Sequence, residues 1–204
     1  LPAPEPGDRS ASSAEPTLWR GVRVVTPRAW ATLVGSATMA MAGLSVFVIS
    51  GSWLDDAFGV STGGIGAVAM AFGAMELVSS LSSATFADRL GKLRSTMAGL
   101  VVLAAGLGIM LVAGDRLALG VAGLLVLLLG FEYGFVTSLS LVSEAMPEAR
   151  GTTLALANAV GTVARAVGAI VGGWLYGRYG IEGTAALSGA AVTTSLACFL
   201  LSRR

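Results

Sequence analysis

Residues 87–94 read ADRLGKLR, a short charged turn between two long apolar runs. Gly91 is the residue at which the chain can most readily reverse. The charges come from Asp88, Arg89, Lys92 and Arg94. In a bilayer, basic residues in a short loop hold that loop on the cytoplasmic side. The stretch therefore predicts two membrane-spanning helices joined by a cytoplasmic turn.

The composition of the whole chain supports this prediction. Charged residues make up 12% of the 204 residues and apolar residues 54%, with a mean hydropathy of +0.79. Soluble domains carry about 25% charged residues, so this chain lacks the polar side chains that a soluble surface needs. The charges lie in short clusters separated by long uncharged intervals, which is typical of a multi-pass membrane protein.

The same counts exclude several classes of site. The chain has no histidine and one cysteine, so histidine proton relays, the usual zinc sites and internal disulfides are excluded. A net charge of +1 gives no basis for nucleic-acid binding. Glu144 and Glu148 lie at a water boundary without the other side chains that an enzyme site needs. We therefore predict neither an enzyme nor a metal or cofactor site.

The first residues are expected outside the membrane. Leu1–Thr17 is rich in Pro, Ser, Ala and acidic residues and has no apolar signal core, which predicts a flexible linker. Leu18–Arg28 is open to two interpretations, more linker or an interfacial helix. Residues 1–28 thus form a cytoplasmic segment and residues 29–204 a transmembrane domain. A first residue that is not Met suggests that further sequence precedes the linker.

Six apolar runs are each long enough to cross a hydrocarbon core of roughly 30 Å. The predicted spans are Ala29–Ser50, Gly63–Ala87, Ser95–Ala113, Leu117–Val142, Gly151–Tyr176 and Thr184–Leu201. Ser61 and Thr62 are expected to cap the second span. The third is nearly all aliphatic and glycine, so we expect it to face lipid at the periphery. The predicted fold is an all-α bundle of six transmembrane helices.

Basic residues orient this bundle, because they accumulate on the cytoplasmic side. An even number of spans places both termini on the side of the 87–94 turn. That side holds Arg9, Arg20, Arg23, Arg28, Arg89, Lys92, Arg94, Arg150, Arg203 and Arg204. The other side holds Arg116 and Arg178, and Arg165 lies within a span. Both termini are therefore expected in the cytoplasm, with the bundle in a bacterial inner (plasma) membrane.

Several stretches resemble the major facilitator superfamily (MFS) of secondary transporters. The turn from Asp88 to Arg94 resembles the loop signature between the second and third helices of an MFS half, although Ala84 replaces the usual Gly and Leu93 interrupts the basic run. Pro147–Gly151 resembles the start of the eleventh helix. Gly161–Gly173 resembles the helix that follows, and Ala57–Ser61 with Gly64 resembles the outer turn before the eighth.

The resemblance spans about Ala29–Arg204 and implies the C-terminal six-helix half of a transporter, built from two three-helix inverted repeats. It implies partnership with an N-terminal six-helix half. It also implies that the turn is a gating loop, formed by Asp88, Arg89, Gly91, Lys92 and Arg94, in which Asp88 pairs with Arg150. The alternative is a turn that only anchors the topology.

Three charges fall near the middle of predicted spans, where an unpaired charge costs roughly 2.5–3.5 kcal/mol on insertion scales. Arg165 would bind an anionic substrate group, or pair with Glu76 or with the missing half. Glu76 would carry a proton in coupled transport, or pair with Arg165. Glu132 would carry a proton, or pack its leucine-rich face against protein. Asn158 would contact substrate or hydrogen-bond a neighbouring helix.

These residues lead to a hypothesis of a secondary transporter that uses the proton gradient to export small hydrophobic or amphipathic compounds. Its partners would be the lipid bilayer, a small-molecule substrate and the other half. Uptake of an organic anion or sugar is the rival within transport, and Arg165 favours it. A non-transporting membrane scaffold or a half-size homodimer is the alternative from another class.

Overall fold

The computed structural model describes residues 26–203 and, within them, every side chain except those at positions 84, 86 and 88. The predicted linker and nearly all of the predicted interfacial segment lie outside the described residues. The elements are α2 (Pro27–Phe58), α3 (Thr62–Leu90), α4 (Lys92–Leu111), α5 (Leu117–Ala145), the 3-10 turn η1 (Pro147–Ala149) and α6 (Arg150–Leu201). The described residues are all-helical, and five helices are long and apolar enough to cross a membrane.

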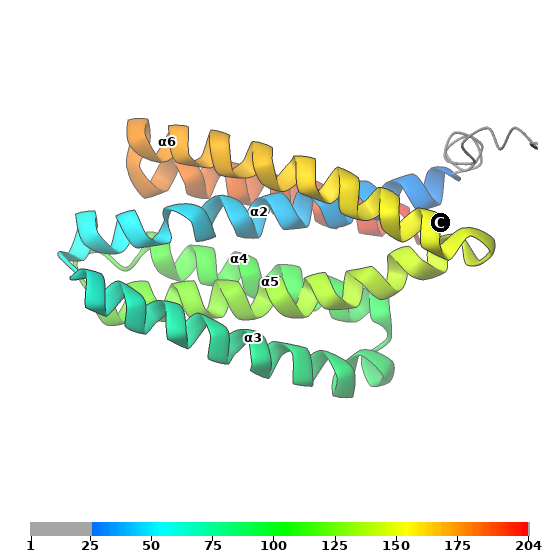
Figure 1. Ribbon diagram of the computed structural model, residues 1–204, viewed down its shortest axis with the longest axis horizontal. Coiled ribbons are helices and arrows are strands. Elements are labelled where there is room, and N and C mark those ends of the chain that lie inside the picture. Colours follow the sequence, from blue (N-terminus) through cyan, green and yellow to red (C-terminus); the bar gives the residue numbers. More distant parts are fainter. Residues whose placement is uncertain (1–25, 204) are drawn as a thin grey trace, which may run out of the picture.

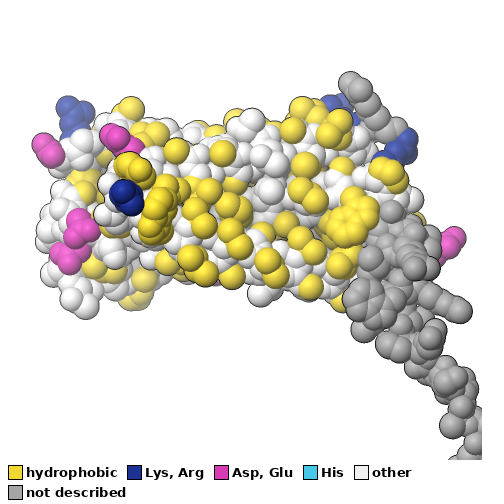
Figure 2. Space-filling model, turned by 90° about the horizontal axis from the view of Figure 1, so that it is seen from above, with side chains coloured by type: hydrophobic (Ala, Val, Ile, Leu, Met, Phe, Trp, Pro, Cys, Tyr) yellow, Lys and Arg dark blue, Asp and Glu magenta, His cyan; other side chains and the backbone are white. Residues whose placement is uncertain are grey.

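The helices lie side by side along the long axis of the molecule (Figure 1). The start of α2, the α3–α4 turn, the α5–α6 connection and the C-terminus lie together at one end. Figure 2 shows acidic and basic side chains gathered toward the two ends of the visible face, with a broad hydrophobic band between them. This distribution fits a bundle whose predominantly apolar middle lies in the bilayer.

Helix α6 is broken at Gly180, whose φ of 64° and ψ of −155° fall in a region open essentially to glycine. The Thr184 hydroxyl donates to the Gly172 carbonyl at 2.9 Å. In an unbroken helix these residues would be about 18 Å apart, so the two arms of α6 fold back on each other. The loop predicted between the last two spans, residues 177–183, is therefore wrong in length, because one glycine makes the reversal.

Other helix ends are also closer together than predicted. Helix α2 continues past Ser50, the predicted end of the first span, as far as Phe58, because Trp53 and Leu54 are buried and the rings of Trp53 and Phe58 pack edge to face at 5.2 Å. The predicted cap is confirmed: the Ser61 hydroxyl accepts a hydrogen bond from the Gly64 N–H at 3.3 Å. In the 87–94 stretch, Gly91 alone, with φ of 83°, separates α3 from α4.

Helix α4 corrects the expectation that the third span faces only lipid. One face of α4 is buried against α5, and glycines permit the contact. A Cβ on Gly99 would lie 2.5 Å from the Gly134 Cα and 2.7 Å from the Gly130 carbonyl oxygen. The buried hydroxyls of Thr96 and Thr137 also meet at 3.0 Å across this interface. The opposite face of α4 remains exposed and apolar.

Helix α2 packs against both arms of α6. Gly168 and Gly172 lie against the α2 backbone, so these two small residues let α2 and α6 approach closely. From the second arm, the Ser188 hydroxyl donates to the Ala42 carbonyl at 3.0 Å, and the Ser195 hydroxyl donates to the Gly35 carbonyl at 2.7 Å. These bonds satisfy buried hydroxyl groups that lipid could not satisfy.

Helix α3 is the least buried of the described spans. It packs mainly on α5, where the Ser79 hydroxyl donates to the Leu129 carbonyl at 3.3 Å. Met70, Leu77 and Leu81 are exposed, and so are Gly73, Glu76 and Ser80. Much of the surface of α3 is therefore not covered by the rest of the described chain.

Candidate functional site

A pocket of about 300 Å³ lies between α2, α3 and α5. It brings together Glu76 from α3 and Glu132 from α5, two of the intramembrane charges singled out in the sequence. The remaining lining is apolar: Leu44, Phe47, Ala69, Phe72, Gly73, Leu128 and Phe131. The two carboxylates thus share one hydrophobic cavity at mid-span.

Aromatic rings form much of the wall of this pocket. The rings of Phe47 and Phe72 lie 5.7 Å apart, tilted by 45°, and join α2 to α3. Phe131 stacks on Phe135 at 5.7 Å. A Cβ on Gly43 would collide with the Phe131 ring, so glycine at this position of α2 lets α5 approach. This contact fixes the turn of α5 that carries Glu132.

The charged side chains that line this pocket are both acidic. Glu132 is half-buried and Glu76 is exposed in the described chain, and the two carboxylates interact electrostatically. Among the described side chains neither one forms an ion pair. Phenyl rings add negative π-faces, which attract cations. The cavity therefore suits a proton or an apolar cation better than an anion.

Arg165 lies outside this pocket, on the first arm of α6. Its Nη2 donates to the Thr162 hydroxyl at 3.1 Å, and that hydroxyl donates to the Asn158 carbonyl at 2.7 Å. The alternative in which Arg165 pairs with Glu76 is not seen in residues 26–203. Asn158 is exposed, and its side chain does not line the pocket. Arg165 and Asn158 therefore occupy a face separate from the two glutamates.

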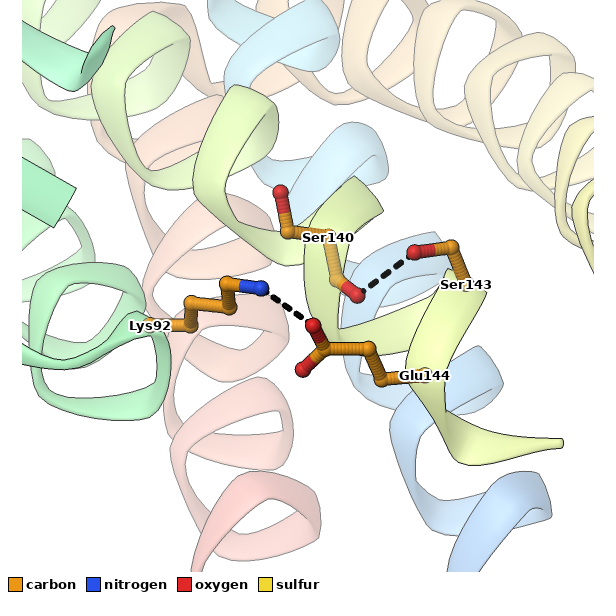
Figure 3. A network of polar contacts seen from close by, with 4 residues as sticks. All are labelled: Lys92, Ser140, Ser143 and Glu144. Carbon is orange, nitrogen blue, oxygen red and sulfur yellow. Dashed lines mark hydrogen bonds and ion pairs between the residues drawn. The ribbon is translucent and has the colours of Figure 1, made fainter. Parts of the chain in front are cut away.

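The gating-loop residues lie at the end of the bundle. Lys92 forms an ion pair with Glu144 on α5 (Figure 3). Ser143 beside it donates to the Ser140 carbonyl at 2.8 Å and closes the last turn of α5 (Figure 3). The sequence analysis did not predict the ion pair between Lys92 and Glu144, because the family resemblance implied a different pair, Asp88 with Arg150. The signal was the position of Glu144, three residues before Pro147, on the helix that packs against α4.

The other loop cations have no ion pair with any described side chain. Arg89, Arg94 and Arg150 are exposed. The Asp88 side chain lies outside the described part of the chain, so its proposed pairing with Arg150 stays a prediction. No group of three or more metal-ligating side chains occurs among the described residues.

A family model described as Major Facilitator Superfamily matches residues 7–204. None of the curated proteins matches the chain. The match covers nearly the whole sequence and agrees with the membrane-length helices. The chain therefore belongs to the Major Facilitator Superfamily, a family of membrane transporters and not of enzymes.

Proposed function

We propose that the chain is the C-terminal half of a secondary transporter that exports hydrophobic or amphipathic compounds in exchange for protons. The pocket between α2, α3 and α5 carries this proposal, because it combines phenyl rings with two carboxylates. None of the described residues that line it is basic. Apolar walls suit the body of such a substrate, while the carboxylates suit a positive charge.

The two carboxylates supply a means of coupling. Charge on both Glu76 and Glu132 is unfavourable in an apolar cavity, and a proton or a cationic substrate relieves that repulsion. Competition between the two for one pocket would exchange protons for substrate. An organic anion, in contrast, would meet two like charges. This chemistry disfavours the rival hypothesis, because Arg165 does not line the pocket.

The reversal at Gly180 supports six membrane crossings, with α6 supplying the last two. The packing supports two inverted repeats. The first crossing, α2, packs on both arms of α6, and the fourth crossing, α5, packs on α3 and α4. If the first, second and third crossings are exchanged with the fourth, fifth and sixth, the contacts of α2 with the two arms of α6 become the contacts of α5 with α3 and α4.

A further six-helix half is the proposed partner of the exposed faces of α3 and α6. Glu76 is exposed on α3, and Arg165 lies on α6 with an exposed Thr162 beside it. Polar groups on lipid-facing surfaces are unfavourable, so a protein partner at these faces is expected. Arg165 would meet substrate or a carboxylate there. If the gene encodes no further spans before Leu1, this part of the proposal fails.

For orientation, we propose a bacterial inner membrane with both ends of this chain in the cytoplasm. One end of the bundle holds helix ends and a chain end that carry the basic residues Arg89, Lys92, Arg94, Arg150 and Arg203. The opposite turns contain Arg116 and Arg178 together with acidic residues. This asymmetry supports the cytoplasmic placement of the first group.

The test is transport by the full-length protein in proteoliposomes. A fluorescent hydrophobic cation is loaded, and its flux is measured with and without an imposed pH gradient. The proposal expects flux to follow the gradient and Glu132→Gln to remove this dependence, because the amide cannot exchange a proton. Flux that ignores the gradient in the unaltered protein would refute proton coupling.

The matched control is Glu182→Gln. Glu182 is an exposed carboxylate beside the Gly180 break in α6. Helix α6 contributes no residue to the lining of the pocket. The same change of charge at this position should leave the gradient dependence intact. If the two variants lose coupling equally, the effect is not specific to the pocket.

A further inference from the structure

A second pocket, of about 590 Å³, opens at the end of the bundle where α3 meets α4. Its lining comes from four places: the end of α3, the start of α4, the last turns of α5 and the end of the chain after α6. It is separate from the pocket that holds Glu76 and Glu132, because the two share no lining residue. It therefore needs its own explanation.

Three basic side chains and one carboxylate line this second pocket: Lys92, Arg94, Arg203 and Glu144. Lys92 is already neutralised by Glu144. Arg94 and Arg203 are exposed and form no ion pair with any described side chain. The two remaining charges belong to arginine, whose planar guanidinium suits a phosphate because it can donate two parallel hydrogen bonds.

The backbone adds to this positive charge. Helix α4 begins at Lys92, and no side chain caps its first turn. The N–H groups of that turn and the positive end of the helix dipole therefore favour an anion near Arg94. The backbone N–H groups and the arginine side chains therefore both favour an anion in this pocket.

The rest of the lining favours a lipid over a free ion. Leu90, Leu93 and Leu141 line the same pocket, and Leu90 is half exposed. The pocket also lies where helices long enough to span a membrane end, which is the level of the lipid headgroups. A cationic site beside apolar side chains matches a phosphate group that carries acyl chains.

We propose that this pocket binds the phosphate group of an anionic phospholipid, with Arg94 and Arg203 as the phosphate ligands. The leucines contact the glycerol and the first part of the acyl chains. Lys92 stays with Glu144, which holds α4 and α5 together beneath the headgroup. Each basic residue near a membrane surface raises the affinity for anionic lipid by roughly fivefold.

The experiment measures binding to the full-length protein in neutral detergent, with phosphatidylglycerol and phosphatidylcholine as the two lipids. The thermal midpoint is followed as each lipid is added. We expect phosphatidylglycerol to raise it at lower concentration than phosphatidylcholine. In the double variant Arg94→Gln, Arg203→Gln, the affinity for phosphatidylglycerol should fall roughly tenfold to thirtyfold, from the loss of two cations.

The matched control carries the same change of charge at the opposite end of the bundle, Arg116→Gln with Arg178→Gln. Its affinity for phosphatidylglycerol should match that of the unaltered protein. Arg203 lies two residues beyond Leu201, the last residue of α6, so Arg203→Gln alone serves if the double variant fails to fold. That single variant should lose about half of the effect on a logarithmic scale.

Three results would overturn the proposal. Equal responses to the two lipids would remove the preference for an anionic headgroup. Equal loss in the control variant would reduce the effect to net charge. Stabilisation by inorganic phosphate or glycerol 3-phosphate at the concentration that suffices for the lipid would identify a free-anion site instead.

Discussion

The interface between α4 and α5 predicts a sharp difference between two glycines of one helix. Gly99→Ala places a methyl group 2.5 Å from the Gly134 Cα and 2.6 Å from its nitrogen. These are backbone atoms of a packed helix, so they cannot move aside as a flexible side chain would. Gly108→Ala on the same helix meets nothing within 4 Å. The pair therefore separates steric conflict from every other effect of the substitution.

The magnitude follows from two opposing terms. Both substitutions replace glycine with the best helix former, which stabilises an exposed helix by about 1 kcal/mol. Only Gly99→Ala adds overpacking, which typically destabilises by about 1–3 kcal/mol. The propensity term cancels in the comparison, so the Gly99 variant should be less stable than the Gly108 variant by about 1–3 kcal/mol. By the scaling of soluble domains of this size, that gap is about 2–12 °C in Tm.

The assay is thermal unfolding of the purified variants in one detergent, with Leu as a second, larger substitution at each position. The Tm should fall further from Gly99→Ala to Gly99→Leu, while the two Gly108 variants should remain close to each other. A Gly99→Ala protein as stable as Gly108→Ala would refute close backbone contact between α4 and α5. So would a Gly99→Leu protein that is no worse than Gly99→Ala.

Three further outcomes are expected. The side chains of Lys92 and Glu144 are 33% and 49% exposed, so a double-mutant cycle on Lys92→Gln and Glu144→Gln should give a coupling free energy of unfolding below about 1 kcal/mol. A larger coupling would show that the ion pair is shielded from solvent. Ser195→Ala should lower stability by about 0.6 kcal/mol through its bond to Gly35, with exposed Thr193→Ala as the control, and equal losses would argue against that bond. Arg165→Ala should strongly reduce transport with normal membrane insertion, which a flux assay and a membrane-fraction blot measure; near-normal flux would remove Arg165 from the site.

Composition and segment length predicted the helices well. Apolar runs of about twenty residues specify a membrane span by length, and Ser61 specified a helix start by its capping chemistry. The exact ends were less predictable. Trp53 and Leu54 are helical because their side chains are buried in tertiary contacts, which cannot be read from the local sequence. Gly180 reverses the chain without the loop expected there.

The pairing of side chains between helices was harder to predict. Spacing places Glu76 and Glu132 on the faces of their own helices, but it does not state how α3 and α5 are rotated against each other. That rotation depends on contacts such as Phe131 against Gly43. For the same reason the glycines of α4 looked like a featureless lipid face, although Gly99 and Gly106 lie seven residues apart and meet α5.

The sparse burial of α3 has a mechanical consequence. α4 and α5 are locked by backbone contact, and α2 is held between the arms of α6, so these elements resist relative motion. Gly59, in the short link before α3, and Gly91, directly after α3, both have positive φ, at 65° and 83°. A tilt of α3 about these two pivots would break few contacts, yet it would move Phe72 and Glu76 directly. The volume of the pocket that holds Glu76 and Glu132 therefore depends on the position of α3, the least buried helix of the described bundle.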